Sequence, residues 1–456
     1  MSNNLYMDIE EKLWKIIDGW RANGVTISDA VRSVLYLLTL KKIFKESMSN
    51  VAEKDSQIVI NHLSPIFYEA KEKDYTDLVT KSGELIEKRY GLQPGFFGSF
   101  FANVSNFESW KTTLNASIQK IKEIPDDEDA ILSAVLTLIM TRGLQPETYR
   151  TAPLISNTSL AEVLNVVLNV QNGDSFMDGT IGCGISALRC VKGTDASIDG
   201  MDINVSVLQI ATLYMILSGR KKFELKVGDF TLAKSTKKYD KIAMDIPFAI
   251  KTGEYIGEQI AISNKWLDGA QGRDLDILLV GKALEVLNEN GRAAIVVPNS
   301  FLSRSGKASR ILREKILEKR MLKAVINLPA LHFETGARSS VLLLEKNDDK
   351  ILFIDIDSIQ MPSFQRNRRE VRVLTPEGRD MLINLLETKE EIKSISAFVD
   401  VQQVKEKQFD FSPVRYVAIK EGLSFRDMQT LNNELKLLYA ELEEIEKENS
   451  KIKLFN

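Results

Sequence analysis

Cysteine and histidine are nearly absent from this chain of 456 residues, which contains two of each. Cys183 and Cys190 are too few to build a disulfide framework. Together with His62 and His332 they form no cluster with the spacing of metal ligands. We therefore expect neither a disulfide-stabilised fold nor a metal site.

Long apolar runs are also missing. The most apolar stretch of the early sequence, residues 34–40, is far too short to cross a bilayer. The opening residues are polar and acidic, and they lack the pattern of a targeting peptide. These absences predict a cytoplasmic protein that makes no contact with a membrane.

The chain also lacks an excess of positive charge. It has 60 Lys and Arg residues against 63 Asp and Glu residues, which gives a net charge of −3. Phosphate contacts require concentrated Lys and Arg, so this balance argues against broad, autonomous binding to polyanions. One predicted helical region is nevertheless basic, and a solvated helix face or a local anion contact explains it equally well. Its members are Arg304, Lys307, Arg310, Arg313, Lys315, Lys319 and Arg320.

The length and the periodicity of the chain predict several domains, because one core rarely serves so many residues. Apolar residues recur at three- and four-residue steps through the first part, which predicts an all-helical domain over residues 1–145. Short apolar runs alternating with helix-length segments predict an α/β domain over residues 146–347. We assign residues 348–424 to a mixed extension and residues 425–456 to a C-terminal helix.

Seven apolar runs define the expected sheet, a doubly wound, Rossmann-like α/β architecture. The last two runs have no helix between them, so the final strand should return antiparallel. That feature favours the sheet found in methyltransferases over that of a dinucleotide-binding dehydrogenase, which stays open as the alternative. The runs are residues 175–177, 197–201, 223–227, 239–244, 293–297, 322–328 and 339–344.

An aspartate follows each of the first four runs: Asp178, Asp202, Asp229 and Asp245. Ligands of open α/β sheets bind at the carboxyl ends of the strands, so these carboxylates should line one edge. One aspartate of this kind is explained as a helix cap, whereas four in succession predict a binding site. Asp178 also opens the loop Asp178-Gly-Thr-Ile-Gly182-Cys-Gly184, where glycines let the backbone approach a nucleotide-like ligand.

The tetrapeptide Asp245-Ile246-Pro247-Phe248 has the groups that an aromatic amine needs for alkylation. The Asp245 side chain and the Ile246 carbonyl can accept the two N–H bonds, and the Phe248 ring can hold the plane of the amine. We therefore expect a site for a planar amine beside the cofactor site.

The C-terminal segment carries an apolar seam with heptad spacing, interrupted by one asparagine. A helix with such a seam needs a partner, either its own protein or another chain, and the second option is favoured. The seam comprises Met428, Leu431, Leu435, Leu438, Leu442, Ile445, Asn449 and Ile452.

The chain resembles the modification subunit of type I restriction-modification systems, a family of adenine-specific DNA methyltransferases. The similarity runs nearly from end to end. The matching segments are Leu13–Arg21, Asp178–Gly184, Gly200–Asn204, Gly228-Asp229, Asp245–Phe248, Gly291–Asn299, Leu328–Gly336 and Phe409–Tyr416.

This resemblance implies transfer of a methyl group from S-adenosyl-L-methionine to the 6-amino group of adenine in DNA, with the base flipped out of the duplex. The catalytic residues that it implies are Asp245, Ile246, Pro247 and Phe248. Asp202 would contact the ribose of the cofactor, Asp229 its adenine, and the segment around residue 150 its methionine end. The implied cofactor-binding residues are Tyr149, Thr151, Asp178, Gly182, Gly184, Asp202 and Asp229.

The implied partners are DNA, a specificity subunit docked on the C-terminal helix, a second copy of the chain and a restriction nuclease subunit. The chain departs from the family at two motifs: Asp245-Ile-Pro-Phe replaces the usual Asn-Pro-Pro-Phe, and the segment around residue 150 replaces the usual Gly-Gln-Phe-Tyr-Thr-Pro. These departures leave a catalytically impaired subunit that acts in assembly or DNA clamping as one alternative. The same tetrapeptide chemistry also suits a glutamine amide in a protein, which is the other alternative. Cytosine C5 methylation fits poorly, because both cysteines lie within the glycine loop and its helix.

Overall fold

A computed structural model describes residues 2–52, 55–68, 74–98, 100–101, 109–141, 158–234, 237–270, 272–329, 338–356, 363–366, 369–372 and 374–417. Tyr149 and Thr151, which are expected to bind the cofactor, lie outside the described residues, as does the heptad segment 425–456. No helix in the described ranges is both long and apolar enough to span a membrane.

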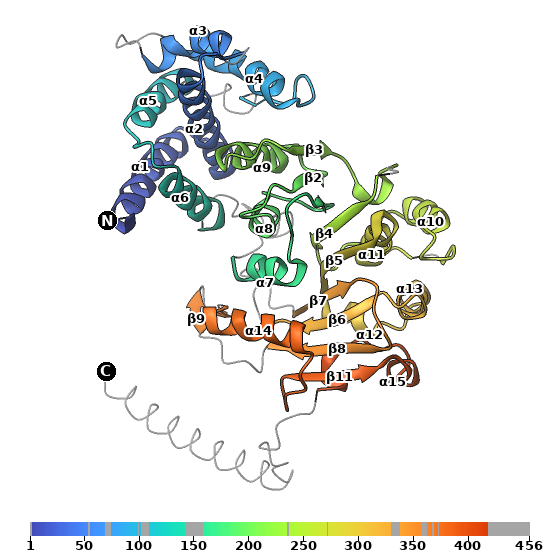
Figure 1. Ribbon diagram of the computed structural model, residues 1–456. Helices are drawn as coiled ribbons and strands as arrows, with labels where there is room; N and C mark the ends of the chain where they lie inside the picture. The colour runs from blue at the N-terminus through green and yellow to red at the C-terminus, as the bar shows by residue number, and fades with distance from the viewer. Residues whose placement is uncertain are drawn as a thin grey trace, which may run out of the picture.

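The N-terminal region is helical, as predicted (Figure 1). Leu13, Ile17 and Trp20 recur on one face of the first helix and are completely buried. Thr26 caps the second helix by accepting a hydrogen bond from the Asp29 amide at 3.1 Å. The helices are α1 (Ser2–Ala22), α2 (Ile27–Ser49), α3 (Ser56–Phe67), α4 (Thr76–Tyr90), α5 (Trp110–Lys122) and α6 (Glu128–Thr141).

The predicted doubly wound sheet is confirmed. Its strands lie in the order β11-β8-β6-β7-β5-β4-β1-β2-β3. Strands β3, β2, β1, β4 and β5 are parallel, and β7 lies between β5 and β6 and runs antiparallel to both, as the missing crossover helix predicted. The seven strands of this part are β1 (Ser175–Asp178), β2 (Ser197–Asp202), β3 (Phe223–Val227), β4 (Tyr239–Asp245), β5 (Leu287–Pro298), β6 (Leu322–Asn327) and β7 (Ser339–Leu344).

The same sheet continues beyond residue 347. β8 (Lys350–Asp355) pairs parallel with β6, and β11 (Ser396–Asp400) pairs antiparallel with β8. Residues 348–400 therefore contribute two strands to the sheet of the preceding α/β region. The remaining elements here are the hairpin β9 (Ser363–Arg366) and β10 (Arg369–Arg372), the helices α14 (Pro376–Thr388) and α15 (Val401–Glu406), and the turn η3 (Pro413–Arg415).

Helices cover the sheet, with one exception to the predicted alternation. Among the described residues, the connection from β3 to β4 contains only the short turn η1 (Phe230–Leu232). The connections from β1 to β2, from β2 to β3, from β4 to β5 and from β5 to β6 carry helices, whereas β6 and β7 pair directly as antiparallel neighbours. The helices are α7 (Thr158–Leu168), α8 (Ile185–Cys190), α9 (Val205–Leu217), α10 (Glu254–Ser263), α11 (Leu275–Val286), α12 (Asn299–Ser303) and α13 (Lys307–Glu318).

Helix α9 joins the helical region to the sheet (Figure 1). Every residue from Val207 to Leu217 is buried, as expected of a helix that is apolar on all faces. Leu208 and Met215 belong to the core of the sheet, whereas Ile210, Leu213 and Ile216 belong to the core of the helical region. The two regions thus share α9 as a common wall.

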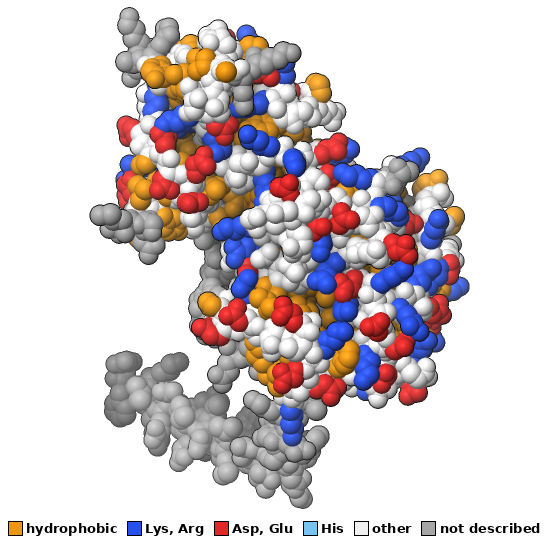
Figure 2. All heavy atoms as spheres, viewed as in Figure 1, with side chains coloured by type: hydrophobic (Ala, Val, Ile, Leu, Met, Phe, Trp, Pro, Cys, Tyr) orange, Lys and Arg blue, Asp and Glu red, His pale blue; other side chains and the backbone are white. Residues whose placement is uncertain are grey.

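Lys and Arg side chains lie among Asp and Glu side chains on the surface around α13 (Figure 2), and several residues of this basic region form ion pairs, including Arg310 with Glu314. Arg304 contacts Asp274 and Asp276, Lys315 contacts Asp268, and Arg320 contacts Asp349. Arg313 is buried and donates to the carbonyl oxygens of Phe301, Arg304 and Phe409. These contacts favour a paired helix face over a local anion contact.

Candidate functional site

The four strand-end aspartates lie at one edge of the sheet. Asp178, Asp202 and Asp245 are the last residues of β1, β2 and β4, and Asp229 lies two residues beyond the end of β3. Since these strands are parallel, their carboxyl ends meet at the same edge, where open α/β sheets bind ligands. The candidate site is built on this edge.

The glycine loop connects β1 to α8 and uses two left-handed residues. Gly182 has φ 53° and Gly184 has φ 78°, conformations that an L-residue with a side chain rarely adopts. Gly184 also lies directly against α9, because a Cβ there would be 3.1 Å from the Met215 side chain. The Gly182 amide donates to the Asp202 carboxylate at 3.2 Å, which ties the loop to the end of β2.

Asp178 is the most deeply buried acid of the site, with 2% of its surface exposed. Its pKa is raised to about 8, chiefly by burial and also by the charges of Asp245 and Asp202, while the Thr180 amide opposes the shift by donating to the carboxylate at 3.0 Å. Burial also raises the pKa of Asp202 above its ordinary value. Crowded carboxyl groups of this kind favour a ligand that brings positive charge or hydroxyl donors.

The end of β2 presents an acceptor and an apolar side chain together. Asp202 accepts from the Asn204 amide at 2.8 Å, and the Asn204 side chain in turn caps α9. Ile203, between them, is 76% exposed. An exposed isoleucine beside a carboxylate can cover the face of a planar ring, a role that the sequence reasoning missed although the residue directly follows a strand-end aspartate.

Asp229 has a structural task as well. Its carboxylate accepts from the Thr231 amide at 2.9 Å and from the Thr231 hydroxyl at 2.6 Å, which caps η1. The Gly228 amide donates to the Asp202 carbonyl at 2.9 Å and holds the end of β3 beside β2. Phe230 packs so closely on Gly179 of the glycine loop that a Cβ there would lie 2.3 Å from its ring.

The tetrapeptide leaves β4 next to the glycine loop. Ile246 is buried, with its amide 3.3 Å from the Val296 carbonyl, whereas Pro247 and Phe248 are half-buried. Ala249 has φ 58°, so the chain turns sharply after Phe248. The Thr180 hydroxyl donates to the Asp245 carbonyl at 3.3 Å and so joins the two motifs. The geometry therefore brings together the cofactor-type and amine-type groups; Tyr149 and Thr151 fall outside the described residues.

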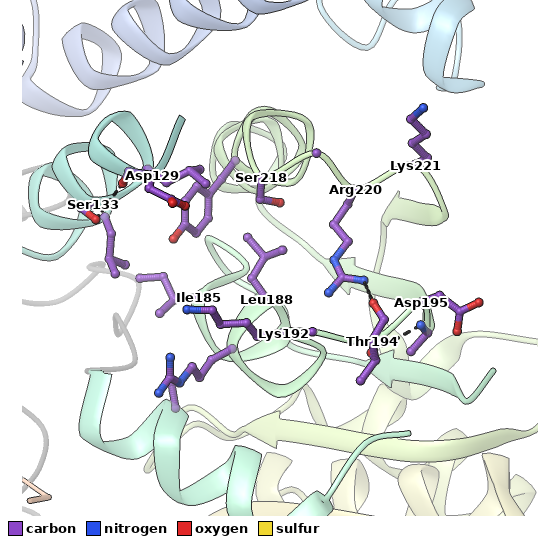
Figure 3. A pocket seen from close by; sticks show the side chains of 18 of the residues that line it. Asp129, Ser133, Ile185, Leu188, Lys192, Thr194, Asp195, Ser218, Arg220 and Lys221 are labelled. Atoms are coloured by element: carbon purple, nitrogen blue, oxygen red, sulfur yellow. Dashed lines mark hydrogen bonds between the residues drawn. The ribbon is translucent and has the colours of Figure 1, made fainter. Parts of the chain in front are cut away.

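A cavity lies away from this edge of the sheet. A cavity of about 980 Å³ is lined by residues of α6, α7, α8 and α9, and Lys192 extends across it toward Ile185 (Figure 3). Its wall includes Ala196 and Lys222, which precede β2 and β3, so it borders the amino ends of these strands. The candidate site stays at the carboxyl edge, where the aspartates and the glycine loop lie.

Comparisons with known proteins agree with this assignment. The family model for N-6 DNA methylase matches residues 156–424. The type I restriction enzyme MpnII methylase subunit of Mycoplasma pneumoniae is 25% identical over 287 residues, which are 58% of this chain and 52% of the relative. The MjaVII methylase subunit of Methanocaldococcus jannaschii is 25% identical over 317 residues, 63% of this chain and 53% of the relative. The chain thus spans about half the length of these curated relatives.

The fold has solved relatives as well. The type I restriction-modification methyltransferase subunit from Streptococcus thermophilus superimposes with a TM-score of 0.69 at 17% identity, covering 90% of this chain and 99% of that one. The expected resemblance to type I modification subunits is confirmed. Because the family model matches more than half of its residues, the chain belongs to the N-6 DNA methylase family.

Proposed function

We propose that the protein transfers a methyl group from S-adenosyl-L-methionine to the 6-amino group of adenine in DNA, as the modification subunit of a type I restriction-modification complex. The observation that carries this proposal is the hydrogen bond from the Thr180 hydroxyl to the Asp245 carbonyl. It holds the tetrapeptide, which suits an aromatic amine, against the glycine loop, which suits a nucleotide-like cofactor.

The residues at the carboxyl edge fit this cofactor. Burial raises the pKa values of Asp178 and Asp202, so a cationic ligand with ribose hydroxyls would stabilise the ionised carboxylates that burial disfavours. Asp202 would accept from the ribose, Ile203 would cover the adenine ring, and Asp229 would lie near its edge. When bound, S-adenosyl-L-methionine supplies a methyl group activated by its own sulfonium.

The tetrapeptide would hold and polarise the target amine. The Asp245 carboxylate accepts one amino hydrogen, the Ile246 carbonyl accepts the other, and Phe248 stacks on the base. As positive charge develops on the amino nitrogen, the carboxylate attracts it more strongly than it attracts the neutral amine, and that difference lowers the barrier. A paired adenine hides its amino group, so the base must leave the duplex first.

The partners follow from the same proposal. DNA is the substrate, and a specificity subunit would dock on the heptad segment 425–456 and supply sequence recognition. A second copy of the chain and a restriction nuclease subunit would complete the complex. The relatives named above are methylase subunits of type I restriction enzymes, which supports an assembly of this kind.

The substitution Asp245→Ala separates binding from transfer. We expect the transfer rate to fall by about 100-fold or more, the cost of losing one polar group directed at developing charge. Calorimetry should show S-adenosyl-L-methionine bound within about threefold of the wild-type affinity, since Asp245 contacts the target rather than the cofactor. Undiminished turnover would refute the role of Asp245. Cofactor binding without transfer by the wild-type complex would instead support the impaired-subunit alternative.

A further inference from the structure

A buried arginine connects the helical region to α9, the helix that follows β2 at the carboxyl edge of the sheet. Arg32 of α2 is 4% exposed and donates to two side chains of α9, reaching the Ser206 hydroxyl at 3.0 Å and the Gln209 amide oxygen at 2.8 Å. It also donates to Asp29 at 2.6 Å and to the Phe100 carbonyl at 3.2 Å. The guanidinium lies 4.9 Å from the centre of the Phe100 ring.

The contact is specific to a guanidinium. Arg32 presents a planar fork of donors that reaches acceptors on α2, on α9 and on the loop at residue 100, which the single ammonium of a lysine cannot do. Gln209, which is 1% exposed, adds a further contact between α9 and the helical region by donating to the Phe96 carbonyl at 2.7 Å. A buried charge with such partners is costly to disturb, because removing it leaves several acceptors without donors.

The contacts of Arg32 and Gln209 hold the first turn of α9. This turn directly follows the end of β2 at the carboxyl edge of the sheet. The Asn204 side chain accepts from the Ser206 amide at 3.0 Å and from the Val207 amide at 3.3 Å. The Asn204 amide donates to Asp202, whose other carboxylate oxygen accepts from the Gly182 amide. A chain of hydrogen bonds and neighbouring residues therefore runs from Arg32 through Ser206 and Asn204 to the carboxylate and the glycine loop.

We propose that Arg32 is a positioning residue for the cofactor site: it fixes the start of α9 and thereby the geometry of Asp202 and the glycine loop. The helical region is then part of the cofactor-binding machinery, although it contributes no side chain to the carboxyl edge among the residues described. The link to cofactor binding rests on the proposed function, whereas the link to loop geometry does not. Packing supports both, since α9 also touches Gly184 through Met215.

Hydrogen exchange of the ligand-free full-length protein tests the geometric link. Arg32→Met removes the donors and keeps an apolar side chain of similar length. We expect exchange of the Gly182, Asn204 and Ser206 amides to become about tenfold faster. Ser206→Ala removes a single acceptor and should give a smaller change of the same pattern, so it decides the question if Arg32→Met does not fold.

Arg313→Met is the matched control. Arg313 is also buried and also donates to several acceptors, the carbonyl oxygens of Phe301, Arg304 and Phe409, but it joins α13 to α12 and to the segment after α15. This variant should lose stability and leave exchange at Gly182 and Asn204 unchanged. Unchanged exchange at these amides in folded Arg32→Met and Ser206→Ala would overturn the proposal.

Calorimetry with S-adenosyl-L-methionine separates this proposal from the proposed function. Arg32→Met should bind S-adenosyl-L-methionine about tenfold more weakly than the wild type does. The affinity of Arg32→Lys should lie between these two, and folded Arg313→Met should bind with wild-type affinity. Equal affinity of Arg32→Met and the wild type would contradict a positioning role in cofactor binding. No heat with the wild type would instead refute the proposed cofactor, while the exchange experiment would still decide what Arg32 does to the loop.

Discussion

Asp178 should hold its proton at neutral pH, because burial beside Asp202 and Asp245 raises its pKa to about 8. An ordinary aspartate ionises near pH 4, as Asp178 does in the unfolded chain. Between these two values the folded protein binds a proton that the unfolded chain has lost. The free energy of unfolding therefore falls as pH rises through this window, and the loss is complete above about pH 8.

Asp178→Asn should remove this dependence. The amide cannot ionise, and its oxygen can still accept from the Thr180 amide. Relative to the wild type, the variant should gain up to about 1.4 kcal/mol of unfolding free energy for each pH unit between roughly 4 and 8. Urea unfolding at pH 5, 6.5 and 8 measures the difference, and parallel stability curves would show that Asp178 ionises normally.

The places of single residues in the fold were predictable where the sequence marks them, as at strand ends. The four aspartates stand at strand ends, so their common edge followed from the apolar runs and the parallel order. Ile203 and Phe230 were missed, because an apolar residue beside an aspartate has no signature until its exposure or its contact with Gly179 is known. Tyr149 and Thr151 remain predictions, since they lie outside the described residues.

At the scale of elements, the glycine loop and η1 are fitted to each other. The Phe230 ring occupies the space where any side chain at Gly179 would have to go. Asp178 precedes the glycine loop and Asp229 caps η1, so a substitution in one segment should shift the position of the other. The close approach explains why glycine follows Asp178 here.

Gly179→Ala should destabilise the protein by about 1–3 kcal/mol, the usual cost of overpacking a buried contact. Adding Phe230→Ala should cost less than the sum of the two single changes, because it removes the atoms that the new methyl group meets. Gly19→Ala is the control: a Cβ there meets nothing within 4 Å, and alanine is the better helix former. Additive losses in chemical denaturation would exclude the contact as the cause.

Elements with local signals were predictable, and those that depend on distant partners were not. The apolar runs at 175–177 and 339–344 correspond to β1 and β7, because a buried strand leaves a short apolar run in the sequence. The pairing of β11 with β8 joins residues more than forty positions apart and leaves no local trace. The described residues between β3 and β4 form only η1, which was not predicted, since a chain segment of helical length need not form a helix.

At the scale of the molecule, the helical region and the sheet share α9 in their cores. α9 is buried on one side by the sheet and on the other by the N-terminal helices. The sequence suggested a division near residue 145, which periodicity supports. Periodicity cannot reveal that Ile210, Leu213 and Ile216 of the α/β region complete the core of the helices.

Deletion of residues 1–145 should therefore leave a protein that does not fold cooperatively. The deletion exposes the apolar face of α9, and large exposed patches lead to aggregation. Dye binding to exposed apolar surface and a broad thermal transition are the expected results. Co-expression of residues 1–145 as a separate chain should restore solubility. A soluble fragment with a wild-type melting midpoint would show that the regions fold independently.

The most direct test of the proposed function uses the full-length protein, co-purified with its native partners, and S-adenosyl-L-methionine labelled in its methyl group. DNA, RNA and protein are offered separately, and digested products are analysed for the methylated species. We predict label in DNA alone, recovered as N6-methyladenine, and about 100-fold less label or lower still with Asp245→Ala. Label on a protein glutamine, or none in DNA from a complex that binds the cofactor, would contradict the account.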